Sequence, residues 1–332
     1  MKVSNKAKQV YFDNAASTKV RDEAIEAMVQ AMRDCYGNPS SMHGYGRQAR
    51  AMLESARESV ANAIGAKPKN VYFTSGGTEA NNWAILGAAD ILMSKSKALR
   101  DGGHIITSAT EHSAVLDPIK KLEAKGWEVS YLLPGTAGHI SAETFSKALR
   151  DDTAIASIML VNNEIGAINP VGEYAREIKR RGLSTILHTD AVQGMCKIPL
   201  SVKALGADLV TVSSHKLHGP KGVGALYVKD GVKLAPLILG GNHEKGIRGG
   251  TEALPAAVGF GEAARLGMLE LEDTASAVRN LREYVSGLLK EEIPGVVFIG
   301  DTNSGDGVSP GDAVLFGGGV SPFILCSNYH EI

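Results

Sequence analysis

Cysteine is scarce in this 332-residue chain, and its three copies, Cys35, Cys196 and Cys326, lie far apart. An odd and scattered set fits neither a disulfide framework nor the spacing of metal ligands, so we predict no metal site. Free thiols of this kind are typical of a reducing compartment and favour the cytoplasm.

The chain also lacks an excess of one charge and any long apolar run. Lysine and arginine number 35 against 36 aspartates and glutamates, which gives a net charge of −1. A nearly neutral chain offers no electrostatic reason to predict binding to nucleic acid or to an acidic membrane. Its apolar runs are shorter than a transmembrane helix, and the polar N-terminal residues do not resemble a signal peptide, so we expect no membrane association.

Glycine, by contrast, is abundant at 38 residues, which suits many tight turns between strands and helices. From residue 71 onward, short apolar segments alternate with segments of helical length. The predicted strands are 71–74, 104–107, 129–133, 155–161, 185–189 and 209–212. The predicted helices between them are 79–89, 113–125, 142–149 and 171–181. This alternation predicts a three-layer α/β fold, with a mostly parallel sheet between two layers of helices.

Beyond Pro255 the pattern changes to two long helices, at 256–271 and 274–291, and a strand at 296–299. We therefore predict two domains. The large one spans residues 23–255, and the smaller α+β domain combines residues 1–22 with 256–332.

Polar motifs follow the ends of the predicted strands, where ligands bind in parallel sheets. Ser213-Ser214-His215-Lys216 ends the last strand, and a lysine on a rigid element can form a Schiff base. Gly77 and Thr78 begin a helix after the first strand, and exposed N–H groups at such a position bind phosphate. Each motif also has a structural interpretation, as a surface His-Lys pair and as a capped helix.

Three further strand ends carry candidate ligands. His112 could stack on a flat ring, Asn163 could bind a ring hydroxyl or a carboxylate, and Asp190 could pair with a pyridinium N–H. The alternatives are a helix cap, an Asx turn and an N-cap aspartate. Successive motifs are about one strand–helix unit apart, so all should project from one edge of the sheet. The ordered set describes a site for pyridoxal 5'-phosphate (PLP).

Taken together, the motifs resemble the cysteine desulfurase branch of the class-V aminotransferases, which are PLP-dependent enzymes of fold type I. The resemblance covers roughly residues 10 to 300. The matching segments are Tyr11–Thr18, Gly37–Ser41, Thr74–Asn82, Glu111-His112, Asn162–Gly166, Asp190–Gln193, Ser213–Gly224 and Gly240–Thr251.

The resemblance implies a role for each matching side chain. Lys216 would bind the cofactor covalently and then transfer protons, Asp190 would pair with the ring nitrogen, and His112 would stack on the ring. Gln193 would reach the phenolic oxygen, and Asn163 would meet that oxygen or the substrate. The residues that would hold the phosphate are Gly77, Thr78, Ser213 and His215.

Thr251 would reach the phosphate of a partner subunit, which implies a homodimer. Its segment departs mildly from the family pattern, with Asn242 for a glycine, Lys245 for an arginine and Gly249 for a serine.

The end of the chain departs more strongly. Family members continue into a mobile loop, whose cysteine takes the sulfur, and an arginine that grips the substrate carboxylate. Neither motif is found here, and Cys326 instead matches the apolar strand before that loop. We expect all three cysteines to be structural and the small domain to be incomplete.

The predicted activity is conversion of L-cysteine to L-alanine with transfer of sulfur, with a sulfur-acceptor protein as a further expected partner. Two alternatives stay open. One is a class-V aminotransferase or lyase that acts on another amino acid, and the other is a catalytically impaired PLP-binding remnant.

Overall fold

Apolar β-branched segments in the middle of the chain form a single seven-stranded sheet. The computed structural model describes residues 10–96, 99, 102–296 and 298. The strands are β1 (Val71–Thr74), β2 (His104–Ser108), β3 (Glu128–Leu132), β4 (Thr153–Ser157), β5 (Ile186–Asp190), β6 (Leu209–Ser213) and β7 (Gly224–Val228). Their order across the sheet is β1-β7-β6-β5-β4-β2-β3.

The sheet is mostly parallel, as the alternation of strands and helices predicts. All pairings among β2 to β6 are parallel, whereas β7 runs antiparallel to both β6 and β1. The strand β7 was not predicted, because its residues follow a Gly/Pro-rich loop that resembles a simple turn.

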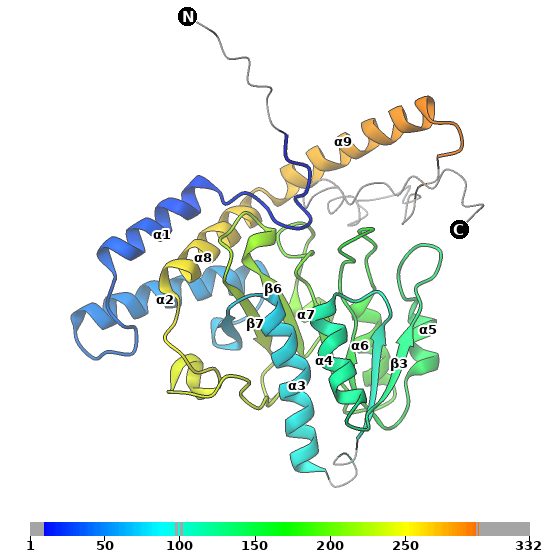
Figure 1. Cartoon of the computed structure of the whole chain (residues 1–332), viewed down its shortest axis with the longest axis horizontal. Coiled ribbons are helices and arrows are strands. Elements are labelled where there is room, and N and C mark those ends of the chain that lie inside the picture. Colours follow the sequence, from blue (N-terminus) through cyan, green and yellow to red (C-terminus); the bar gives the residue numbers. More distant parts are fainter. Residues whose placement is uncertain (1–9, 97–98, 100–101, 297, 299–332) are drawn as a thin grey trace, which may run out of the picture.

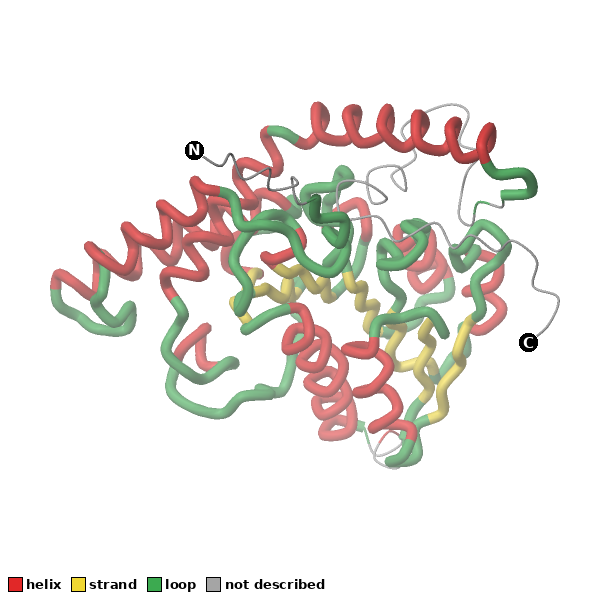
Figure 2. Tube along the Cα trace, turned by 45° about the horizontal axis from the view of Figure 1, so that its top comes forward, coloured by secondary structure: helices red, strands yellow, loops and turns green. Residues whose placement is uncertain are grey.

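Helices of several lengths surround the sheet (Figures 1 and 2). They are α1 (Asp22–Asp34), α2 (Gly44–Ala63), α3 (Gly77–Lys95), α4 (Ser113–Glu123), α5 (Ala142–Ala148), α6 (Val171–Arg180), α7 (Val202–Leu205), α8 (Leu254–Leu269) and α9 (Leu271–Glu292). Within the described ranges, none of them is long and apolar enough to cross a membrane.

Neighbouring residues of one strand enter two different hydrophobic cores, which confirms the three layers. Ile105 of β2 packs in one core with Trp83 of α3 and Ile119 of α4. The next residue, Ile106, packs in the other core, which includes Phe145 of α5 and Tyr174 of α6. Because side chains alternate along a strand, each core lies on its own face of the sheet.

Some predicted boundaries were wrong. The predicted strand at 155–161 ends at Ser157, and residues 158–161 continue as a buried loop whose backbone still donates to His188 and Asp190 of β5. Apolar residues there are buried without a full ladder of hydrogen bonds, so periodicity could not reveal the end of the strand.

The helices α1 and α2 were not predicted. Part of the predicted strand at 296–299, and the whole of 300–332 with Cys326, lies outside the described residues.

The two long helices after Leu254 take different courses. α8 packs against α1 and α2, while α9 extends along the outside of the molecule (Figure 1) and buries none of its side chains. The predicted change of pattern near Pro255 coincides with the start of α8. The division into two domains stays a prediction.

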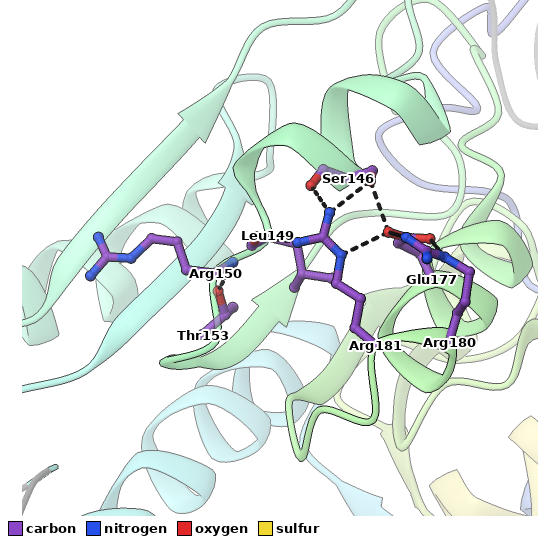
Figure 3. Close-up of polar contacts among 7 residues, drawn as sticks. All are labelled: Ser146, Leu149, Arg150, Thr153, Glu177, Arg180 and Arg181. Atoms are coloured by element: carbon purple, nitrogen blue, oxygen red, sulfur yellow. Dashed lines mark hydrogen bonds and ion pairs between the residues drawn. The ribbon is translucent and has the colours of Figure 1, made fainter.

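Side chains on one helical layer fasten α6 to α5 (Figure 3). The guanidinium of Arg181 donates to the carbonyl oxygens of Ser146 and Leu149, at 2.6 and 2.7 Å. Its Nε donates to Glu177 at 2.8 Å, and Arg180 binds the same carboxylate. Carbonyl groups at the end of α5 would otherwise lack partners, so this cluster fixes the helix against its neighbour.

A buried ion pair fixes the segment between β7 and α8. Arg57 and Glu244 are only 3% and 5% exposed, and two N–H groups of the guanidinium meet the carboxylate at 2.7 and 2.8 Å. The same carboxylate accepts the backbone N–H of Phe73 at 3.0 Å, and Arg57 also donates to Val71 at 2.9 Å. The pair therefore joins α2, β1 and the Gly240–Thr251 segment.

Glu244→Ala is expected to lower the free energy of unfolding by about 3 kcal/mol or more, because it leaves the Arg57 guanidinium buried without its anion. Urea denaturation followed by circular dichroism would measure the change. The matched control is Glu143→Ala, which breaks an exposed ion pair with Lys147 and should leave the midpoint nearly unchanged. Equal shifts for the two variants would contradict this assignment.

Candidate active site

A pocket of about 510 Å³ lies at the carboxyl edge of the parallel strands. Its volume falls within the range of roughly 300–1,000 Å³ that is usual for small organic ligands. Every predicted site residue except Thr251 lines it: Gly77, Thr78, His112, Asn163, Asp190, Gln193, Ser213, His215 and Lys216. The tertiary structure thus brings together residues from five strand ends.

The turn between β1 and α3 forms one end of the pocket. Glu79, in the first turn of α3, accepts the backbone N–H of Ser75 at 2.7 Å and so shapes the turn. A Cβ on Gly77 would lie 3.0 Å from Val192, and one on Gly224 would lie 2.7 Å from the backbone of Gly76. Glycine at these positions lets the strands and the turn approach closely, leaving the N–H groups of α3 open to an anion.

Ser213 supplies a hydroxyl at the same end of the pocket. It is the last residue of β6 and is 1% exposed, and its Oγ has no hydrogen-bond partner among the residues that the structure describes. Buried polar atoms are rarely left without partners. An acceptor oxygen of a ligand in the pocket would supply the hydrogen-bond partner that this hydroxyl lacks.

Asp190 holds a buried carboxylate at the end of β5. Its Oδ2 accepts from the side chain of Asn81 at 2.6 Å, and its Oδ1 accepts from the backbone N–H of Val192 at 2.9 Å. Burial raises the pKa of Asp190, while these hydrogen bonds and the charge of Lys216 act against that rise. A cationic N–H in the pocket would stabilise the ionised form further.

Lys216 reaches the pocket from the short helix after β6. Its Nζ donates to the carbonyl oxygens of Ala15 and Ala16, at 2.5 and 2.9 Å. Burial lowers the pKa of this amine, and nearby carboxylates, Asp190 foremost, oppose the shift. A lysine with a lowered pKa loses its proton more readily and is a better nucleophile.

His112 and His215 face the pocket from different elements. The Nδ1 of His112 accepts the backbone N–H of Ala114 at 3.0 Å, so this residue caps α4 while its ring lines the pocket. The structural interpretation of His112 was therefore correct, and stacking on a ring stays a prediction. Burial, together with Lys216, lowers the pKa of His215 to about 4, so its imidazole is neutral at pH 7.

The remaining predicted residues occupy distinct positions. Gln193 is 4% exposed and donates to the carbonyl of Ala15 at 3.1 Å. Asn163 lies at the mouth, where it donates to Glu164 at 2.6 Å. Thr251 is exposed and does not line this pocket. Its implied contact with a partner's phosphate stays a prediction.

Sequence reasoning missed Asn81, Lys197 and the carbonyl groups of Ala15 and Ala16. Asn81 lies three residues after Thr78, on the same face of α3, and that helical spacing could have revealed it. The carbonyl groups could not be found, because backbone atoms carry no sequence signal. Lys197 was missed because it lies in a turn whose sequence is typical of a loop. Its amine donates to Gln193 at 2.7 Å.

Comparison with known proteins defines the class. A family model described as aminotransferase class-V matches residues 10–308. A NifS-like protein of known structure superposes with a TM-score of 0.80 at 41% identity, over 85% of this chain and 76% of that one. The chain belongs to the class-V aminotransferases, which are PLP-dependent enzymes of fold type I.

Two further relatives narrow the assignment. Cysteine desulfurase IscS from Dictyoglomus turgidum is 45% identical over 293 residues, which cover 88% of this chain and 72% of that protein. A structure described as SspA in complex with cysteine has a TM-score of 0.72 and 40% identity, over 77% of this chain and 72% of that one. The chain belongs to the cysteine desulfurase branch of the family.

The residues present fit the cofactor of this family. An anion is matched at one end of the pocket by the N-terminus of α3 and the unpartnered Ser213 hydroxyl. The buried carboxylate of Asp190 suits a protonated ring nitrogen, and the Lys216 amine suits an aldehyde. One cavity thus offers a site for the phosphate, a carboxylate for the protonated ring nitrogen and an amine for the aldehyde, as PLP requires.

Ser213→Ala is expected to weaken PLP binding by about 10- to 100-fold, the usual effect of losing a hydrogen bond to a charged group. The melting temperature without PLP should not fall, since the hydroxyl has no partner in the described part of the chain. Absorbance titration with PLP would measure the affinity, with Ser94→Ala on the exposed end of α3 as control. Unchanged affinity in Ser213→Ala would argue against this phosphate site.

Proposed function

We propose that this protein is a PLP-dependent cysteine desulfurase, which removes sulfur from L-cysteine and leaves L-alanine. The observation that carries the proposal is the convergence of Lys216, Asp190 and the α3 turn in one pocket. Further support comes from the desulfurase relatives and from the cysteine complex of a similar structure. A sulfur-acceptor protein as partner and a cytoplasmic location stay predictions.

Each residue of the pocket has its own role in the proposed reaction. Lys216 holds the cofactor and later moves a proton at the substrate carbon, a role that its lowered pKa favours. Asp190 would keep the ring nitrogen protonated, and His112 would lie against the ring. PLP would supply an electron sink when bound. Gly77, Thr78, Ser213 and neutral His215 would hold the phosphate.

Sulfur acceptance needs a thiolate that can reach the substrate. Cys35 is buried. Cys196 is also buried, and burial raises the pKa of its thiol to about 12. Its Sγ donates to the carbonyl of Ala264 at 3.6 Å, away from the pocket. Neither of these two cysteines suits that role, which agrees with their predicted structural role.

Borohydride reduction of the PLP-loaded protein is expected to leave a pyridoxyl adduct on Lys216, which peptide mass spectrometry would locate. Lys216→Ala should retain PLP through the phosphate contacts but give no adduct and no turnover. With L-cysteine and excess dithiothreitol, which reduces the removed sulfur to sulfide, wild type should release sulfide and alanine in equal amounts. A keto acid product would instead identify an aminotransferase. Binding of PLP without any product would identify the impaired remnant.

Assembly as a homodimer is part of the proposal. Thr251 is exposed, although the family motif assigns it to a phosphate, and a partner's pocket would account for both. The Arg248 guanidinium binds Glu79 at 2.8 and 3.0 Å, and this fixes the segment that carries Thr251. Exposed Leu237 and Leu239 flank it with apolar surface that a partner would cover.

Light scattering is expected to report a dimer at micromolar concentration. Thr251→Val should lower PLP affinity through the other subunit's site. Mixed dimers of Thr251→Val and Lys216→Ala then carry both changes in one pocket and neither in the other, so they should regain activity. A monomer with full PLP occupancy would rule out the shared site.

A further inference from the structure

Lys197 is a buried lysine without an anionic partner. It is 6% exposed, and in the described part of the chain its Nζ forms no ion pair with a carboxylate. Its one hydrogen bond runs to the side-chain Oε1 of Gln193, at 2.7 Å. Burying an ammonium group costs free energy, so packing alone does not account for a lysine at this position.

Successive turns after β5 place the two side chains together. The N–H groups of Gly194 and Met195 donate to Ala191, and those of Lys197 and Ile198 donate to Gly194. This coiling brings Gln193 and Lys197, four residues apart, to the same side of the segment. Gln193 then faces the main pocket, and Lys197 lies behind it.

The contact fixes the orientation of the Gln193 amide. An ammonium group only donates hydrogen bonds, so Gln193 must turn its oxygen toward Lys197. The amide nitrogen is then directed to the other side, where it donates to Ala15 at 3.1 Å and borders the pocket. The carbonyl of Ala15 favours the same orientation, and without Lys197 that single contact would be left to hold the amide.

Lys197 borders a second cavity of about 160 Å³. The polar residues that line this cavity include Arg21, Lys216, His218 and Glu270. Burial lowers the pKa of Lys197 to about 7, Lys216 acts in the same direction, and Cys196 opposes it. Both the ammonium and the neutral amine carry N–H groups, so the contact with Gln193 persists through this titration. The cavity has room for water to meet the other N–H groups.

We propose that Lys197 is a positioning residue, which holds Gln193 with its amide N–H group toward the phenolic oxygen of PLP. The proposal rests on the proposed PLP site. An N–H donor stabilises an oxygen anion, whereas an amide oxygen in its place would repel it. Lys197 therefore acts on the cofactor through Gln193 without touching it.

The test follows the absorption band of bound PLP as a function of pH, which reports the proton affinity of the cofactor. Loss of the donor should make the bound cofactor hold its proton more tightly. In Lys197→Met and in Gln193→Leu we expect the transition to move to higher pH, by roughly one unit, a tenfold change in the dissociation constant. The control Lys203→Met, at an exposed position of α7, should not move it.

A double-mutant cycle separates positioning from simple support of the fold. Lys197→Met should add no further shift in the Gln193→Leu background, because both act on one hydrogen bond. A purely structural lysine would lower thermal stability and leave the transition in place, which would overturn the proposal.

If Lys197→Met does not fold, Gln193→Leu decides, since an unmoved transition there excludes Gln193 as the donor. Failure of wild type to take up PLP would overturn the proposed function itself and, with it, this role.

Discussion

The buried carboxylate of Asp190 is the charge around which the pocket is arranged. Removing a carboxylate from water costs free energy unless polar groups replace the lost solvent. Asn81 and the backbone of Val192 supply two hydrogen bonds, and Lys216 supplies a nearby positive charge. Because Asn81 belongs to α3, this helix must cross the sheet at β5. The same helix begins at the turn after β1, so this turn and Asp190 have a fixed separation.

A second constraint joins the beginning of the described chain to the loop after β6. The segment around Ala15 lies against the loop after β6, where Thr18 exchanges hydrogen bonds with His215 and His218. The carbonyl of Ala15 accepts from both Lys216 and Gln193. Backbone atoms from the beginning of the chain thus complete a pocket whose side chains come from its middle. Rigid positioning of this kind is what a covalent cofactor site needs.

Structural and functional roles coincide in several residues. His112 caps α4 and lines the pocket, and Glu79 shapes the turn before α3 while it binds Arg248. Polar side chains at strand ends are already needed to satisfy helix termini. A ligand site built there uses groups that the fold has placed, which explains why each motif alone could be interpreted either way.

The sequence by itself determined the alternation of strands and helices, the mostly parallel sheet and the strand ends that carry Asp190, Ser213 and Lys216. These follow from periodicity and from the ordering of polar motifs, which are local properties. Only the tertiary structure decided that β7 is antiparallel, that Asn81 meets Asp190, and that Lys197 holds Gln193. Thr251 shows the same limit, since its place outside the pocket depends on the path of a long segment. Contacts between distant residues arise from packing, and no local pattern encodes them.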